Sequence, residues 1–198
     1  MLKWRLNFEK ERFIGYICNN KQRTIMKATK VNIQDIARYT ILRLNQNGNT
    51  ICPLKLQKVL YYMQAWHMVY FGRENTLFDD VPEAWVNGPV YRSVYETYRE
   101  IPIYEQIKPS FLGINPSEDL HNKIEELCRS LLLTEKQNEF IESIFCHYGT
   151  MSHDRLVYLT HSQGPWNNAR KGLAAFEYTD EKIDLNDMFD YYSKSIKK

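Results

Sequence analysis

The stretch that decides the fold is residues 54–71, LKLQKVLYYMQAWHMVYF, which is apolar or aromatic except at two lysines, two glutamines and one histidine. Its apolar residues fall on every side of a helical wheel, and such a helix is buried either in a protein core or in a membrane. Because a charge at membrane depth costs roughly 2.5 kcal/mol or more, the lysines favour a core helix. We expect Pro53 to open this helix and Gly72 to end it.

Helical periodicity and capping residues predict further helices around this central one. Residues 32–47 repeat apolar side chains at helical spacing behind a possible N-cap, Asn32, and Thr134-Glu-Lys-Gln137 matches a capping box for a helix over 135–147. Other helices are expected over 90–99, 118–132, 152–159 and 184–195, and from Gly164-Pro165 onward. Residues 77–86 look extended, and 101–118 should form a structured loop or short β-ribbon. The sequence therefore predicts a mainly α, compact single-domain helical bundle around a buried central helix, with a small β-ribbon or short strands.

The net charge of +2 is unevenly distributed along the 198 residues. Residues 1–30 contain eight Lys or Arg and two Glu, a net of +6, which leaves −4 for the rest. We expect residues 1–31 to form a basic arm and 32–198 the folded domain, ending in a helix. The arm is either disordered or lies upstream of the true start, for which Met26 is the candidate. Because phosphate neutralisation dominates nucleic-acid affinity, the acidic body disfavours nucleic acid as a partner, and DNA or RNA contact would have to come from the arm.

Several functional classes lack their sequence signatures. The first thirty residues contain no uninterrupted apolar region of the kind found in secretory signals, and the four cysteines form no CxxC pair, so we expect reduced thiols and a cytoplasmic protein. The histidines at 147, 153 and 161, with Cys146 nearby, match no metal-ligand spacing. No glycine-rich phosphate loop or GxSxG motif is present. We therefore predict no catalytic residue, no cofactor and no metal, and do not expect an enzyme.

Two Gly-Pro turns flanked by aromatic residues remain, in Trp85-Val-Asn-Gly-Pro-Val-Tyr91 and His161-Ser-Gln-Gly-Pro-Trp166. One interpretation is that both are helix entries anchored by tryptophan packing. The other is that they form two aromatic platforms on one recognition surface, since Trp and Tyr are common energetic anchors of protein interfaces. The polar residues Lys55, Gln57 and Lys58 of the central helix should either extend to the surface or meet acidic partners.

Three segments in order resemble one known family. They are KLQKxLYYxQAWH at 55–67, EAWxxGPVxxxVY at 83–95 and TH(S)xGPW at 160–166, and together they resemble the SocA-like, or Panacea, domain of bacterial antitoxins. The resemblance covers roughly residues 32–175. The His or Tyr familiar before Gly-Pro in this family is Asn87 here.

This resemblance implies an antitoxin of a two-gene toxin–antitoxin module, often carried by a prophage, that neutralises its cognate toxin by direct protein–protein binding. Two alternatives stay open: an adaptor that delivers the toxin to an ATP-dependent protease, and a nucleic-acid-binding regulator. No membrane partner is expected. The residues predicted to contact the partner are Lys55, Lys58, Trp85, Asn87, Gly88, Pro89, Tyr91, His161, Ser162, Gly164, Pro165 and Trp166.

Overall fold

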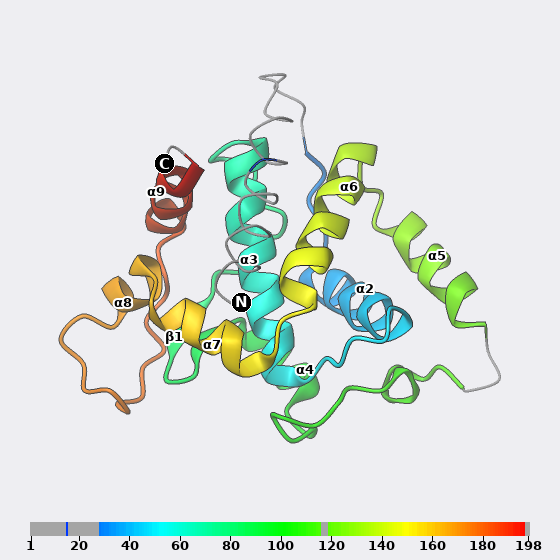
Figure 1. The fold of residues 1–198 in the computed structure, drawn as a ribbon, viewed down its shortest axis with the longest axis horizontal. Helices are drawn as coiled ribbons and strands as arrows, with labels where there is room; N and C mark the ends of the chain where they lie inside the picture. Colours follow the sequence, from blue (N-terminus) through cyan, green and yellow to red (C-terminus); the bar gives the residue numbers. More distant parts are fainter. Residues whose placement is uncertain (1–14, 16–27, 116–118, 197–198) are drawn as a thin grey trace, which may run out of the picture.

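The computed structural model describes residue 15 and residues 28–115 and 119–196. Within them helices predominate, and two short strands form an antiparallel ribbon, so the expected mainly α fold with a small ribbon is confirmed (Figure 1). The elements in chain order are α2 (Ile33–Gln46), α3 (Pro53–Phe71), β1 (Glu83–Trp85), β2 (Gly88–Val90), α4 (Arg92–Tyr98), η1 (Pro109–Leu112), α5 (Leu120–Ser130), α6 (Glu135–Ile144), η2 (Phe145–Gly149), α7 (His153–His161), α8 (Gly164–Ala169) and α9 (Leu185–Ile196).

Helix α3 lies at the centre of the molecule, with α2, α6, α7 and α9 packed around it (Figure 1). Every residue from Leu54 to Val69 is buried, as expected for a helix that is apolar on all sides. Pro53 occupies the first turn, where a missing N–H costs nothing, and Gly72 ends the helix with a φ of +114°. The predicted central core helix is confirmed. In the described part of the chain, no helix is long and apolar enough to cross a membrane.

The capping predictions for the two flanking helices are also confirmed. The Asn32 side chain accepts a hydrogen bond from the Gln34 N–H, and Thr134 and Gln137 form a reciprocal capping box. One helix end differs from expectation, because α6 stops at Ile144 and its last turn widens into a π-helix, η2. A close contact accompanies this change: a Cβ on Gly149 would lie 2.5 Å from a Leu44 methyl carbon, so η2 approaches α2 as closely as only glycine allows.

The histidine of the central helix is an internal hydrogen-bonding residue. His67 Nδ1 lies 2.8 Å from the Asn75 carbonyl oxygen and therefore donates its proton there, which leaves Nε2 to accept from Gln137 Nε2 at 3.1 Å. Burial lowers the pKa of His67 to about 4, so the ring is neutral near pH 7. The same Gln137 side chain bonds both backbone groups of Thr29. Residue 29 of the predicted arm is thus bonded to the domain, whereas residues 1–14 and 16–27 lie outside the described part.

The ribbon corrects one prediction. We expected Asn87-Gly88-Pro89 to turn the chain into a helix over 90–99, but Gly88 and Pro89 belong to β2, which pairs antiparallel with β1, and α4 starts only at Arg92. The other edge of β1 is covered by the chain near residue 182, where the Ala84 N–H bonds the Glu181 carbonyl. The hairpin is therefore closed on this side, which removes an exposed strand edge.

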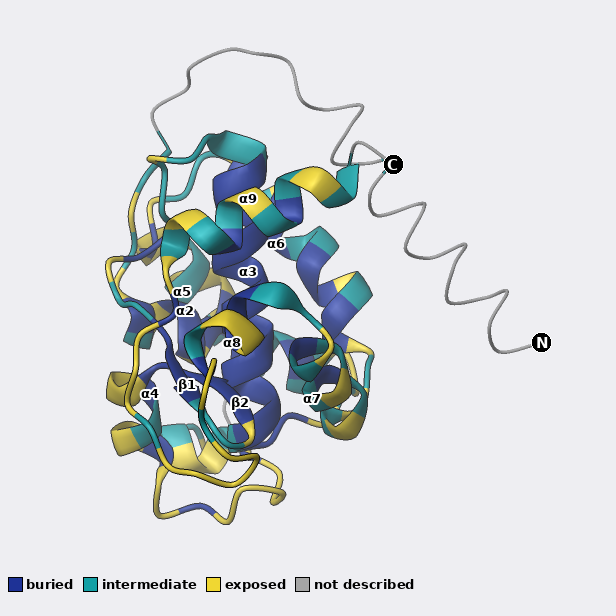
Figure 2. Ribbon diagram, turned by 90° about the vertical axis from the view of Figure 1, so that its left-hand side faces the viewer, coloured by how far each residue is buried: buried dark blue, intermediate teal, exposed yellow. Residues whose placement is uncertain are grey.

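The remaining helices form with shifted bounds: α4 and α5 are shorter than expected, α7 ends two residues later, at His161, and α9 is displaced by one residue. Residues 101–115 are irregular apart from the short helix η1, and α5 begins behind its N-cap, Asp119, so the expected helix over 118–132 is trimmed to Leu120–Ser130. Helix α9 packs on α3 and forms one flank of the molecule (Figure 1). Figure 2 shows the buried α3 behind α8 and α9. It also shows largely exposed loops at the end of the molecule where the hairpin lies.

Candidate partner-binding site

Two glutamines of α3 hold the extended chain that leads to the ribbon and out of it. Gln57 accepts from the Tyr91 N–H at 2.7 Å and donates to the Tyr91 carbonyl at 3.3 Å. Seven residues further along the helix, Gln64 does the same for the Leu77 N–H and the Phe78 carbonyl, at 2.8 and 2.9 Å. Each amide therefore supplies this backbone with the acceptor and the donor that a neighbouring strand would otherwise provide.

The two lysines of α3 also bond backbone carbonyls. Lys58 is fully buried and its Nζ donates to the Pro89 carbonyl at 3.0 Å, whereas Lys55 donates to the Thr50 carbonyl at 2.8 Å. Burial lowers the pKa of Lys58 to about 7 and also lowers the pKa of Lys55. The expectation that Lys55, Gln57 and Lys58 reach the surface or meet acidic groups is wrong in this structure, because all three are buried and serve the backbone of the same chain.

Gly88 is the point at which α3, the hairpin and α7 meet. Its φ is +94°, and a Cβ there would lie 2.7 Å from Lys58 Cε and 2.9 Å from Thr160 Oγ1. Both distances are below any normal carbon contact, so only glycine fits between the two side chains. The Lys58 and Thr160 side chains, 102 positions apart in the sequence, thus flank the hairpin from two helices.

The second Gly-Pro turn opens α8, as predicted, and anchors the hairpin from a third helix. Trp166 Nε1 donates to the Trp85 carbonyl at 2.9 Å, and Arg170 donates to the Ala84 carbonyl at 2.8 Å. The His161 ring stacks on Trp166, with centroids 4.1 Å apart and planes 14° from parallel. Burial, then the nearby Lys58 charge, lowers the pKa of His161, so its stacked ring is neutral near pH 7. The structure therefore brings both Gly-Pro segments together.

Trp85 forms a wall on the outer side of this junction. Its indole N–H donates to Glu83 at 2.7 Å, and the same carboxylate receives two bonds from the Arg92 guanidinium, at 2.9 and 2.7 Å. The Trp85 ring packs edge-on against Tyr95, with centroids 4.8 Å apart, and lies near Tyr178. These contacts fix the indole orientation before any partner arrives.

The twelve residues predicted to contact a partner divide by exposure. Asn87 and Ser162 are exposed, and Trp85, His161 and Gly164 are half-buried. The others are buried: Lys55, Lys58, Gly88, Pro89, Tyr91, Pro165 and Trp166. Lys55 is bonded at the start of α3, whereas the other residues gather around the hairpin and the α7–α8 turn. We call Trp85, Asn87, His161 and Ser162 the hairpin face, because among the twelve they are the non-glycine residues that retain exposed surface.

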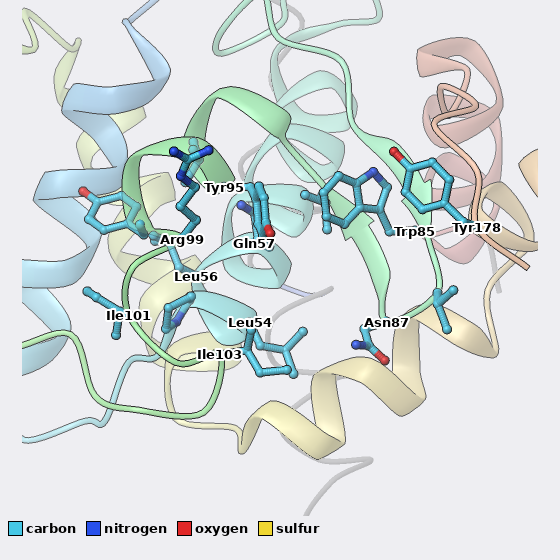
Figure 3. A pocket seen from close by; sticks show the side chains of 15 residues that line it. Leu54, Leu56, Gln57, Trp85, Asn87, Tyr95, Arg99, Ile101, Ile103 and Tyr178 are labelled. Atoms are coloured by element: carbon cyan, nitrogen blue, oxygen red, sulfur yellow. The ribbon is translucent and has the colours of Figure 1, made fainter. Parts of the chain in front are cut away.

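Beside the hairpin face lies a cavity of about 290 Å³ that the sequence did not indicate (Figure 3). It opens between the first turns of α3, the hairpin, α4 and the loop after α4, and Leu54, Trp85, Val94, Tyr95, Ile103 and Tyr178 are among its lining residues. We call it the hairpin cavity. Its residues come from segments up to 125 positions apart, so no local pattern could have revealed it, although Trp85 was among the predicted contact residues.

The described residues contain no group of three or more His, Cys, Asp or Glu side chains placed to hold a metal ion. His147 and His153 lie on η2 and α7, and His161 ends α7 with its ring against Trp166. Cys52, Cys128 and Cys146 are free thiols, and Cys18 lies outside the described residues.

One family model matches the sequence. Its description is antitoxin SocA-like, Panacea domain, and it covers residues 56–167, more than half of the chain. The matched region runs from the first turn of α3 into α8 and so includes the hairpin and both Gly-Pro segments. No curated protein and no solved structure matches the chain.

Proposed function

The chain belongs to the SocA-like antitoxin family with its Panacea domain, and from this premise we propose that it neutralises a cognate, separately encoded toxin in the cytoplasm by direct binding. In this proposal the toxin contacts the hairpin face, and binding masks the toxin's active surface. The domain from residue 32 onward carries the function, and the basic arm takes no part in it. No catalytic step, cofactor or metal is needed.

The observation that carries the proposal is the family match over the segment that builds the hairpin face. The geometry supports it in a second way. Lys58, Trp166 and Arg170 each bond a hairpin carbonyl, so the hairpin is held from α3 and from the α8 region. A surface that is rigid before binding loses little conformational entropy on binding, which favours affinity.

The buried and exposed residues therefore receive different roles. Lys58, Gly88, Pro89 and Trp166 support the hairpin from beneath, so their substitution should act through folding. Asn87 and Ser162 reach solvent and are the residues through which a direct contact would be made.

A growth assay tests the proposal. The product of the gene adjacent to this one is expressed alone and then together with this chain, with and without residues 1–25. We expect the neighbour to arrest growth, both forms of the chain to restore it, and the two proteins to co-purify. A harmless neighbour, or rescue without a complex and with loss of the toxin protein, would contradict neutralisation by masking; the second result would point to proteolytic delivery.

The contact surface is tested by bulky substitutions on exposed residues. Asn87→Arg and Ser162→Arg should abolish rescue while leaving the melting temperature within about 2 °C of wild type, because surface substitutions rarely change stability by more than ~0.5 kcal/mol. The control is Ser110→Arg, at an exposed position of η1 outside the hairpin face, which should keep full rescue. Full rescue by all three variants would show that the toxin does not contact the hairpin face.

A further inference from the structure

The hairpin cavity is lined mainly by apolar and aromatic side chains. Fifteen residues line it, and Arg99 is the charged one among them (Figure 3). Cavities that hold drug-sized ligands usually span about 300–1,000 Å³, so a volume of about 290 Å³ is at the lower limit of that range. The space fits one or two side chains better than a cofactor.

Two polar side chains of the lining, Gln57 and Arg99, are already bonded within the chain, whereas the buried Tyr98 hydroxyl has no hydrogen-bond partner among the described residues. Both ends of the Gln57 amide bond the backbone of Tyr91, which fixes the orientation of the amide. Arg99 bonds Glu96 at 2.7 Å and contacts Glu100 at 3.4 Å. Asn87 lies at the rim, on the solvent side. Within the cavity, the Gln57 amide and the Arg99 guanidinium are therefore already engaged, and most of the other lining side chains are apolar or aromatic.

The charged residues at the rim, Arg92 and Arg99 with their glutamate partners, favour an uncharged occupant. Arg92 is paired with Glu83, and Arg99 is paired with two glutamates, so each cation carries its counter-charge. A carboxylate entering here would find each cation already paired and would meet the charge of the same glutamates. An ammonium group would lose its hydration on entering the apolar cavity. An uncharged apolar side chain meets neither penalty and gains the burial energy of its surface.

The mouth of the cavity also exposes apolar surface. Ile103 is 41% exposed and Tyr178 is 63% exposed, and both line the cavity. Exposed apolar residues are ordinary when scattered, but a group around a cavity is typical of an interaction site. Trp85 both walls this cavity and belongs to the hairpin face, so the two surfaces are continuous.

We propose that the hairpin cavity receives an apolar side chain, of leucine, methionine or aromatic type, that projects from the bound toxin. This inference rests on the proposed function and deepens it, because it names the chemistry of the toxin group that the antitoxin recognises. The buried apolar anchor supplies affinity, and the surrounding hairpin face fixes the orientation of the partner.

The test introduces a charge at the mouth of the cavity. Ile103→Arg places a cation where the apolar anchor must enter, while the Leu54 N–H still bonds the backbone carbonyl at position 103. The matched control is Leu132→Arg, at a 75% exposed leucine between α5 and α6, outside the cavity lining. Affinity for the purified toxin is measured by calorimetry, together with the melting temperature and growth rescue.

We expect Ile103→Arg to weaken toxin binding roughly 10- to 100-fold, the loss equivalent to one buried apolar side chain, and Leu132→Arg to leave it unchanged. Wild-type protein that binds no toxin overturns the proposed function. Wild-type protein that binds, with unchanged affinity in Ile103→Arg, overturns the cavity alone. One further result overturns the cavity proposal. If the free chain is a dimer, and Ile103→Arg dissociates this dimer without changing toxin affinity, the cavity is occupied by a second copy of the chain.

A measurement on unsubstituted protein covers the case in which Ile103→Arg fails to fold. Hydrogen–deuterium exchange compares the free chain with its toxin complex over residues 53–58 and 85–103. Slower exchange around the Leu54–Ile103 hydrogen bond and along α4 supports occupancy of the cavity. Equal exchange rates there in a saturated complex overturn it.

Discussion

Replacing Gly88 by alanine tests how strongly the hairpin is held between α3 and α7. The backbone at this position has a φ of +94°, which a side chain rarely adopts, and that alone costs about 1–3 kcal/mol. The new Cβ would also lie 2.7 Å from Lys58 Cε and 2.9 Å from Thr160 Oγ1. Neither neighbour moves freely, because Lys58 is fully buried and bonded to Pro89, and the Thr160 hydroxyl is bonded to a carbonyl within α7. Such crowding typically costs another ~1–3 kcal/mol.

The chain contains a matched control for the backbone contribution. Gly172 has nearly the same φ, +91°, but a Cβ there would meet nothing within 4 Å. Gly172→Ala therefore carries the conformational cost and the same gain from a less flexible unfolded chain, without the crowding. The difference between the two variants isolates the contact of the hairpin with Lys58 and Thr160.

Urea and thermal denaturation measure this difference. For a chain of this size a loss of 1 kcal/mol lowers the melting temperature by roughly 2–4 °C, so Gly88→Ala should melt roughly 2–12 °C below Gly172→Ala. It should also lose toxin binding more than its stability predicts, because the shifted hairpin carries Asn87. Equal melting temperatures for the two variants would refute the reasoning, since the hairpin could then move away from the two helices at no cost.

Further predictions concern the polar residues of α3. Burial lowers the Lys58 pKa from 10.5 to about 7 in the folded chain, so between pH 7 and 8.5 the unfolded chain binds more protons, and the free energy of unfolding should rise with pH by up to ~1.4 kcal/mol per unit. Lys58→Met should abolish that slope in urea titrations, and an unchanged slope would show that Lys58 is not its source. Gln57→Leu leaves the buried Tyr91 N–H unpaired, while the Tyr91 carbonyl keeps the bond from the Tyr95 N–H, and should cost ~1–3 kcal/mol. Gln106→Leu, at an exposed glutamine, should cost less than ~0.5 kcal/mol. Comparable losses in the two glutamine variants would contradict the bridging role of Gln57.

Local signals in the sequence were sufficient for most helices. Asn32, Pro53, Gly72 and the Thr134–Gln137 capping box mark helix ends within a few residues of where the structure places them. These signals work because capping and backbone restriction depend on neighbours within one helical turn.

The hairpin was mispredicted for the opposite reason, since its cause is not local. Gly88 and Pro89 also suit a helix entry, and the extended alternative prevails because Gln57 and Lys58 supply backbone partners from 31 to 34 positions away. For the same reason the cavity was not predicted, since its lining residues are far apart in the sequence and come together only on folding. The same cause also explains why Lys55, Gln57 and Lys58 were expected at the surface or against acidic partners: in sequence, a lysine that bonds a distant carbonyl looks the same as one that reaches water.

The division between buried and exposed residues has a consequence for partner choice. The motif residues that support the resemblance, such as Lys58, Gly88 and Trp166, are buried and hold the hairpin in place. The residues around the mouth of the cavity, such as Ile103 and Tyr178, lie outside those motifs and face solvent. Substitutions at the mouth leave these hairpin contacts intact, whereas substitutions in the motifs disturb them. If the proposed function holds, the scaffold can therefore stay fixed while the proposed contact surface changes.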